Sequence, residues 1–190
     1  VPNYHIPESL TFKEVLKKGA SLSLEKEKLF HSDLAFLQYT GGTTGISKGA
    51  ELSHGNIVAN MQQISAWMKP KLRDREEIVI TALPLYHIFA LTVNCLSMLK
   101  IGAHNVLITN PRDMPAFCKE MSKHRFTVFL GVNTLFNGLL NQEAFRKLDF
   151  SGLKVAVGGG MAVQKSVAQR WQKVTGCPLA EGYGLTETSP

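Results

Sequence analysis

The sequence is poor in cysteine, with three among 190 residues, and only 19% of its residues are charged. Cys95, Cys118 and Cys177 form no CxxC pair and no CxxH spacing, which argues against both a disulfide framework and a zinc site. We interpret them as thiols in a reducing compartment. The 44% of hydrophobic residues are scattered along the chain, which excludes a disordered tail, a collagen-like fibre and a coiled coil.

A targeting signal and a clear membrane span are also missing. The first residues carry no initiator methionine, no basic segment and no apolar segment, so we expect a cytoplasmic protein. Residues 78–99 carry no formal charge, but Pro84, His87 and Asn94 interrupt them. The β-branched start of this stretch favours a buried strand, a turn and a buried helix over a transmembrane helix.

Charge of one sign is only mildly in excess. Lysine and arginine outnumber aspartate and glutamate by 21 to 15, a net charge of +6. The densest basic segments are 69–75 and 119–125, and acidic residues interrupt the first, which is typical of a solvated face and not of a nucleic-acid-binding stripe. We therefore expect no nucleic-acid partner, whereas the mild positive field suits an anionic ligand.

Apolar runs alternate with helical patterns after residue 33, so residues 1–33 form a peripheral lead-in and residues 34–190 the main domain. The alternation predicts an α/β fold, a layered and mostly parallel sheet with flanking helices, in which ligands bind at the carboxyl ends of the strands. A short amphipathic helix is expected around residues 10–16. The predicted strands are 34–39, 49–53, 78–82, 105–108, 127–130 and 154–157, and the predicted helices are 55–67, 88–100, 114–123, 134–141 and 163–175.

The loop between the first two predicted strands is rich in small residues. Glycine, serine or threonine occupies seven of the eight positions 40–47, and Lys48 follows. Glycines allow backbone N–H groups to approach a ligand, hydroxyls add donors and the lysine adds a charge, which together suit a polyphosphate. A flexible surface loop is the alternative. A Walker A loop is excluded because Ser47-Lys48-Gly49 leads into a strand and not into a helix.

Three segments of the sequence resemble one family. These segments are residues 39–49, Pro84-Leu85-Tyr86-His87 and residues 181–187. In residue type and in order they are similar to the motifs of adenylate-forming enzymes, which include acyl-CoA synthetases, luciferases and the adenylation domains of peptide synthetases. The flanking residues are most similar to bacterial long-chain fatty acid–CoA ligases. The resemblance covers nearly the whole chain, more loosely its first 30 residues, and implies the central part of an acyl-CoA synthetase-like large domain.

The resemblance implies a ligase that uses ATP, Mg²⁺, a long-chain fatty acid and coenzyme A. The fatty acid carboxylate attacks the α-phosphate of ATP to form an acyl-adenylate and pyrophosphate, and coenzyme A then displaces AMP. Because the substrate dissolves in membranes, peripheral association with the inner face of the membrane stays an alternative to a purely cytoplasmic location.

The resemblance also assigns residues to these steps. Catalytic roles fall to Lys48, Thr186 and Glu187, and to His87, which is expected to orient the acyl carboxylate and not to act as a base. Glu187 and Thr40 are expected to bind the metal, and Tyr183, between two glycines, to stack on adenine. The expected nucleotide-binding residues are Thr40, Gly41, Gly42, Thr43, Thr44, Gly45, Ser47, Lys48, Gly158, Gly159, Gly160, Gly182, Tyr183, Gly184 and Thr186.

An acyl channel is the least specific expectation. Its predicted lining residues are His87, Gly131, Val132, Thr134 and Phe136. The alternatives are that the apolar residues, at helical spacing, belong to the core and that the lone histidine has a structural role. For Gly158 to Gly160 the alternative is a tight strand-to-helix turn.

The family's site is completed by other parts of its own chain, namely an N-terminal segment, a ribose-binding aspartate, a hinge and a C-terminal domain with a catalytic lysine. We therefore expect residues 1–190 alone to form no acyl-adenylate at a useful rate. We also expect the loop 40–48 and the motif 181–187 to converge on one nucleotide, with strands 34–39 and 154–157 in related sheets. Alternative functions are a non-catalytic nucleotide-binding module, another acyl- or aryl-adenylating enzyme, and a phosphate-loop NTPase or kinase.

Overall fold

The computed structural model describes residues 6–40 and 47–190, and the chain divides into two compact units, Val1–Phe30 and His31–Pro190. The first unit contains α1 (Phe12–Gly19), the short helix that the sequence predicts. Thr11 caps it: its hydroxyl accepts a hydrogen bond from the backbone N–H of Glu14, whose carboxylate accepts one from the N–H of Thr11. No residue of α1 is buried.

The second unit is built on a parallel sheet of five strands. These are β3 (Ile78–Thr81), β4 (His104–Leu107), β5 (Val128–Gly131), β6 (Val155–Gly158) and β7 (Leu179–Glu181), in the order β4-β3-β5-β6-β7. Every residue of β5 and of β6 is buried, as expected for a parallel sheet covered on both faces. The α/β prediction is confirmed. The three-residue edge strand β7 was not predicted because Leu-Ala-Glu carries no β-branched run.

A separate antiparallel pair carries the glycine-rich loop. β1 (Leu34–Thr40) pairs with β2 (Lys48–Ser53), so that Thr40 lies opposite Lys48. β1 and β6 are thus in different sheets and share no strand pairing. The antiparallel pair contacts the segment that follows β3. The side-chain amide of Gln38, on β1, donates a hydrogen bond of 2.7 Å to the backbone carbonyl of Tyr86.

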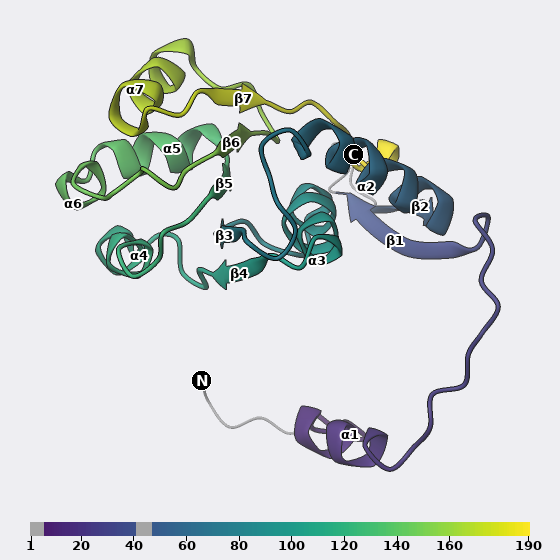
Figure 1. Cartoon of the computed structure of the whole chain (residues 1–190). Helices are drawn as coiled ribbons and strands as arrows, with labels where there is room; N and C mark the ends of the chain where they lie inside the picture. The colour runs from purple at the N-terminus through teal and green to yellow at the C-terminus, as the bar shows by residue number, and fades with distance from the viewer. Residues whose placement is uncertain (1–5, 41–46) are drawn as a thin grey trace. The chain divides into compact units, whose positions relative to one another are not determined.

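Helices cover both faces of the five-stranded sheet (Figure 1). α4 (Met114–Met121), α5 (Asn133–Leu140), α6 (Glu143–Arg146) and α7 (Lys165–Thr175) pack on one face through an apolar cluster that contains Phe129, Phe136 and Trp171. α2 (His54–Met68), with the helical segment 90–100, covers the other face through a second cluster, which contains Met68, Val93 and Met98. The short α6 was not predicted.

The single helix predicted over 88–100 is confirmed in its extent, but its hydrogen-bond register differs from that of a regular α-helix. Residues 88 and 89 are α-helical, Ala90–Ser97 forms a π-helix, η1, and Met98–Lys100 is α-helical again as α3. Thr92 donates a 2.8 Å hydrogen bond to the carbonyl of Ile88, and Asn94 donates a 3.1 Å hydrogen bond to the Thr81 hydroxyl. These buried polar contacts attach the helical segment to β3 and to its own first turn. The spacing of apolar residues does not reveal a π-helix, which has a wider turn than an α-helix. Within the described residues, no helix has the length and apolarity to cross a membrane.

Candidate nucleotide-binding site

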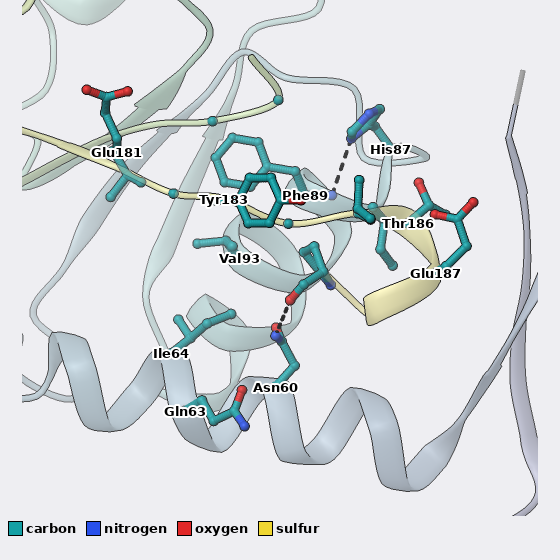
Figure 2. Close-up of a pocket in the computed structure, with 18 of the residues that line it drawn as sticks. Asn60, Gln63, Ile64, His87, Phe89, Val93, Glu181, Tyr183, Thr186 and Glu187 are labelled. Atoms are coloured by element: carbon teal, nitrogen blue, oxygen red, sulfur yellow. Dashed lines mark hydrogen bonds between the residues drawn. The ribbon is translucent and has the colours of Figure 1, made fainter. Parts of the chain in front are cut away.

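A cavity of about 890 Å³ lies at the carboxyl ends of β6 and β7. The segments that form it are far apart in the sequence: the ends of the β1–β2 hairpin, one face of α2, residues 87–89, the turn after β6 and residues 180–187 (Figure 2). The position agrees with the rule that ligands of parallel α/β sheets bind where the strands end.

The hairpin and the C-terminal motif contribute to the same cavity. The cavity is lined by Thr40 and Lys48 from the hairpin and by Thr186 and Glu187 from the C-terminal motif. Thr40 precedes the glycine-rich loop and Lys48 follows it. Ser47 is exposed, and its hydroxyl donates to the Thr40 carbonyl at 3.3 Å. The predicted phosphate-binding residues Gly41, Gly42, Thr43, Thr44 and Gly45 lie outside the described residues.

The three glycines after β6 have three different environments. A Cβ on Gly158 would lie 2.5 Å from Val163 Cγ2, so core packing explains this glycine, which does not line the cavity. Gly159 lines the cavity, and a Cβ there would lie 2.9 Å from the Phe89 ring. Gly160 also lines it and has a φ of +75°, which favours glycine. Gly159 and Gly160 thus expose backbone to the cavity, and the positive φ of Gly160 belongs to a tight turn after β6.

Residues 182–184 present an aromatic ring to the cavity. The N–H of Gly182 donates a 2.8 Å hydrogen bond to the Gly158 carbonyl, which fixes this segment beside β6. The Tyr183 side chain is 92% exposed and lines the cavity. A Cβ on Gly184 would lie 2.7 Å from Pro190 Cβ, so close packing requires glycine there. The Tyr183 ring is free of core packing and is available for stacking.

Thr186 and Glu187 begin the short 3₁₀-helix η2 (Thr186–Thr188), and both line the cavity. Glu187 is exposed and forms no ion pair with any residue in the described ranges. A carboxylate and the nearby hydroxyl of Thr40 are oxygen donors of the kind that Mg²⁺ prefers. No cluster of three or more His, Cys, Asp or Glu side chains suited to a metal occurs in the described part of the chain.

His87 is exposed, lines the cavity and lies three residues before η1. Its Nδ1 atom accepts a hydrogen bond of 3.3 Å from the backbone N–H of Phe89 (Figure 2). A ring nitrogen that accepts carries no proton, so the neutral imidazole holds its proton on Nε2 and can donate from that atom.

The other predicted acyl-binding residues are not brought to this cavity. The Phe136 ring is fully buried, with its centroid 4.8 Å from that of Trp171. Gly131 is buried in β5, and Thr134 is exposed near the start of α5. None of Gly131, Val132, Thr134 and Phe136 is among its described lining residues.

One face of α2 contributes residues that the sequence analysis missed. Asn60, Gln63, Ile64, Trp67 and Met68 line the cavity, and Phe89 and Val93 face them from η1 and its N-cap. The spacing i, i+3, i+4, i+7 marks one helix face, but Asn60 and Gln63 break the apolar pattern that would have identified it. The side-chain amide of Asn60 donates a hydrogen bond to the Pro190 carbonyl (Figure 2).

The lining of the cavity contains a polar group of residues and an apolar group, here called its polar end and its apolar end, and Gln63 and Glu181 line it as well. Lys48 is the one lysine or arginine among the described lining residues, and it lies at the same end as Thr40 and Glu187. Ile64, Met68, Val93 and Val157 form the apolar end, which continues into the second core cluster. The arrangement suits a ligand that is anionic at one end and apolar at the other.

Comparison with known proteins identifies one enzyme family. The profile of the AMP-binding enzyme family matches residues 4–190. The chain is 55% identical over 190 residues to the long-chain-fatty-acid–CoA ligase of Escherichia coli O6:H1, covering 100% of this chain and 34% of that enzyme. It is 39% identical over 182 residues to the enzyme of the same name from Bacillus subtilis, covering 95% of this chain and 32% of that one.

Among solved structures, the chain is similar to ATP-bound MatB from Rhodopseudomonas palustris. The TM-score is 0.75 at 26% sequence identity, and the match covers 93% of this chain and 34% of MatB. The chain thus spans about a third of the length of these relatives. With the family profile matched over almost every residue and the three motifs in their expected order, the chain belongs to the AMP-binding enzyme family.

Proposed function

We propose that the chain is the nucleotide-binding core of an ATP-dependent long-chain fatty acid–CoA ligase. The observation that carries the proposal is that Thr40 and Lys48 line the same cavity as Thr186 and Glu187, although the two motifs are separated by most of the sequence. The 55% identity to the E. coli ligase supports a fatty acid as the acyl substrate.

The triphosphate of ATP lies at the polar end of the cavity in this proposal. Lys48 offsets the charge of the departing pyrophosphate, and the Thr186 hydroxyl donates to the α-phosphate. Tyr183 stacks on adenine from the exposed side, and the backbone of Gly159 and Gly160 borders the base. Because two anions must meet in the reaction, charge neutralisation and alignment are what these residues contribute.

The oxygen donors at the polar end fit a Mg²⁺ ion held jointly with ATP. Glu187 and Thr40 would hold it together with phosphate oxygens, since Mg²⁺ in nucleotide sites uses one or two carboxylates and the substrate's phosphates. The ion supplies positive charge that reduces the repulsion between the triphosphate and the incoming carboxylate.

The acyl chain lies at the apolar end of the cavity, between α2 and η1. Phe89 and Val93 line one side of it, and Ile64 and Met68 line the other. His87 lines the same cavity, and its Nε2–H donates to the fatty acid carboxylate and orients it. A fatty acid is already ionised at neutral pH, so no general base is needed. This placement replaces the channel along residues 131–136 that the sequence suggested.

The proposal is tested by fatty-acid-dependent exchange of pyrophosphate into ATP, measured on the full-length protein. A ligase exchanges pyrophosphate when palmitate is added and forms palmitoyl-CoA when coenzyme A follows. Release of orthophosphate in place of pyrophosphate would instead identify an NTPase or kinase. Nucleotide binding without any exchange would identify a non-catalytic module.

We also place the protein in the cytoplasm. Cys118 and Cys177 are buried and free, and Cys95 is free as well, which agrees with a reducing compartment. Fractionation of cells followed by immunodetection tests this location, and recovery from the periplasm would contradict it.

A further inference from the structure

A second cavity, of about 360 Å³, lies beside the last turn of α2. Ile64 and Met68 line both cavities. Met68 is 5% exposed and belongs to the apolar cluster that also contains Leu72, Val93 and Met98. Ile64 and Met68 therefore border both cavities.

The lining of the second cavity has a buried part and an exposed part. Leu72, Met98 and Ile101 form an apolar floor that also contains the buried hydroxyl of Ser97, and the exposed residues Lys69, Asp74 and Lys100 form its rim. The Lys100 ammonium donates a 3.1 Å hydrogen bond to the Ser65 hydroxyl. A hydrocarbon chain entering from the first cavity would find apolar surface up to this rim and charged groups beyond it.

The chemistry of these two side chains differs. Methionine is unbranched and has three rotatable bonds, so it changes shape at small cost, whereas isoleucine is stiff at χ1. Rotation of Met68 alone can therefore connect the two spaces, with Ile64 as the fixed side of the passage.

We propose that Met68 is a movable wall that determines how long an acyl chain the enzyme accepts, with the methyl end of long chains passing it into the second cavity. The proposal rests on the proposed function, because it concerns the acyl substrate of the same site. Chains that end before Met68 occupy only the first cavity. Longer chains displace the Met68 side chain and gain apolar contact with the floor formed by Leu72, Met98 and Ile101.

The test is the dependence of kcat/KM on chain length in the full-length protein, measured with saturated fatty acids from octanoate to stearate. Met68→Ala removes the wall and should raise the activity on stearate relative to that on dodecanoate. Met68→Leu keeps the volume but adds a branch, so it folds readily and should lower the same ratio. Each methylene newly buried or newly excluded changes kcat/KM by about fourfold.

Ile57→Ala is the matched control, because Ile57 is also buried, lies on the same helix and lines neither cavity. It should lower stability without changing the ratio. Equal loss of activity at all chain lengths in both Met68 variants would show that Met68 is only structural and would overturn the proposal. No activity of the unmodified protein on any fatty acid would instead refute the proposed function.

Discussion

The side-chain amide of Asn60, on α2, donates a hydrogen bond of 2.5 Å to the backbone carbonyl of Pro190. Pro190 follows η2, so this contact ties the segment that carries Thr186 and Glu187 to a helix that packs on the sheet. The Oδ1 atom of Asn60 is buried and has no partner among the described residues. Asn60 thus holds one end of the cavity in place.

Replacing Asn60 with alanine should loosen the 186–190 segment. Since the lost hydrogen bond is worth about 1 kcal/mol, we expect kcat/KM for ATP to fall by about fivefold, with a smaller effect on the KM for fatty acid. Steady-state kinetics with each substrate varied separately measures the difference. Gln62→Ala, an exposed change on the same helix outside the cavity, should leave both parameters as they are.

Lys48 should contribute to the rate more than to binding. Lys48→Met removes the one described cationic side chain at the polar end of the cavity, and we expect kcat for adenylate formation to fall by about a hundredfold or more. Single-turnover measurement of pyrophosphate release gives this rate directly. Lys69→Met, at an exposed position outside this cavity, is the control, and equal rates in the two variants would contradict the role of Lys48.

Glu187→Gln tests the metal assignment. The amide keeps the shape of the side chain but not its charge, so the variant should need a higher Mg²⁺ concentration for half-maximal activity, by about tenfold. Titration of activity with Mg²⁺ at constant free ATP gives this value. An unchanged Mg²⁺ requirement would mean that Glu187 does not hold the ion.

Stability should fall in acid because of Glu77, which lies at the opposite end of the sheet from the cavity. Burial opposes its ionisation, but hydrogen bonds led by that from Lys154, whose Nζ lies 2.7 Å from Oε1, outweigh it and lower the pKa of Glu77 below its ordinary value of 4.5. A lowered pKa gives stability that is fully present above pH 4.5 and lost as the pH falls through the folded-state pKa.

The measurement is the thermal midpoint of the full-length protein between neutral and acid pH. Glu77→Gln should have a flatter profile than the unmodified protein below pH 4.5. Lys154→Met removes the ion-pair partner of the buried carboxylate, which keeps its hydrogen bond from the Arg73 N–H, and should cost about 2 kcal/mol at neutral pH. Identical acid profiles for the unmodified protein and Glu77→Gln would exclude Glu77 as the source of the pH dependence.

The sequence predicted the regular elements where their signals are local. Each predicted strand and each of the helices 55–67, 114–123, 134–141 and 163–175 has a counterpart that differs only at its ends. Asp113 and Pro115, for example, mark the start of α4, where the Asp113 carboxylate accepts a hydrogen bond from the Ala116 N–H. Helix 88–100 was predicted with the correct bounds, but its π register over Ala90–Ser97 was not, because apolar spacing does not distinguish a π-helix from an α-helix.

The candidate site was predicted in part. Motif residues such as Lys48, His87 and Tyr183 were recognised because their residue types and order carry the resemblance, and they meet at one cavity. Gly158 was assigned to the nucleotide from its place in the glycine run after strand 154–157 and from the resemblance, and in the structure its close contact with Val163 explains the glycine. The α2 residues Asn60, Gln63 and Trp67 were missed because no single helix reveals which of its faces borders a cavity.

By itself the sequence determined the family, the parallel α/β core and the polar residues that suit a triphosphate, because glycine placement, apolar periodicity and motif order are properties of neighbouring residues. Only the tertiary structure decided that Thr40 and Glu187 share a cavity, that Phe136 belongs to the core and that Met68 borders two cavities. These outcomes depend on how sheets and helices pack across long sequence distances, and the volume left between packed elements is not a property of any one segment.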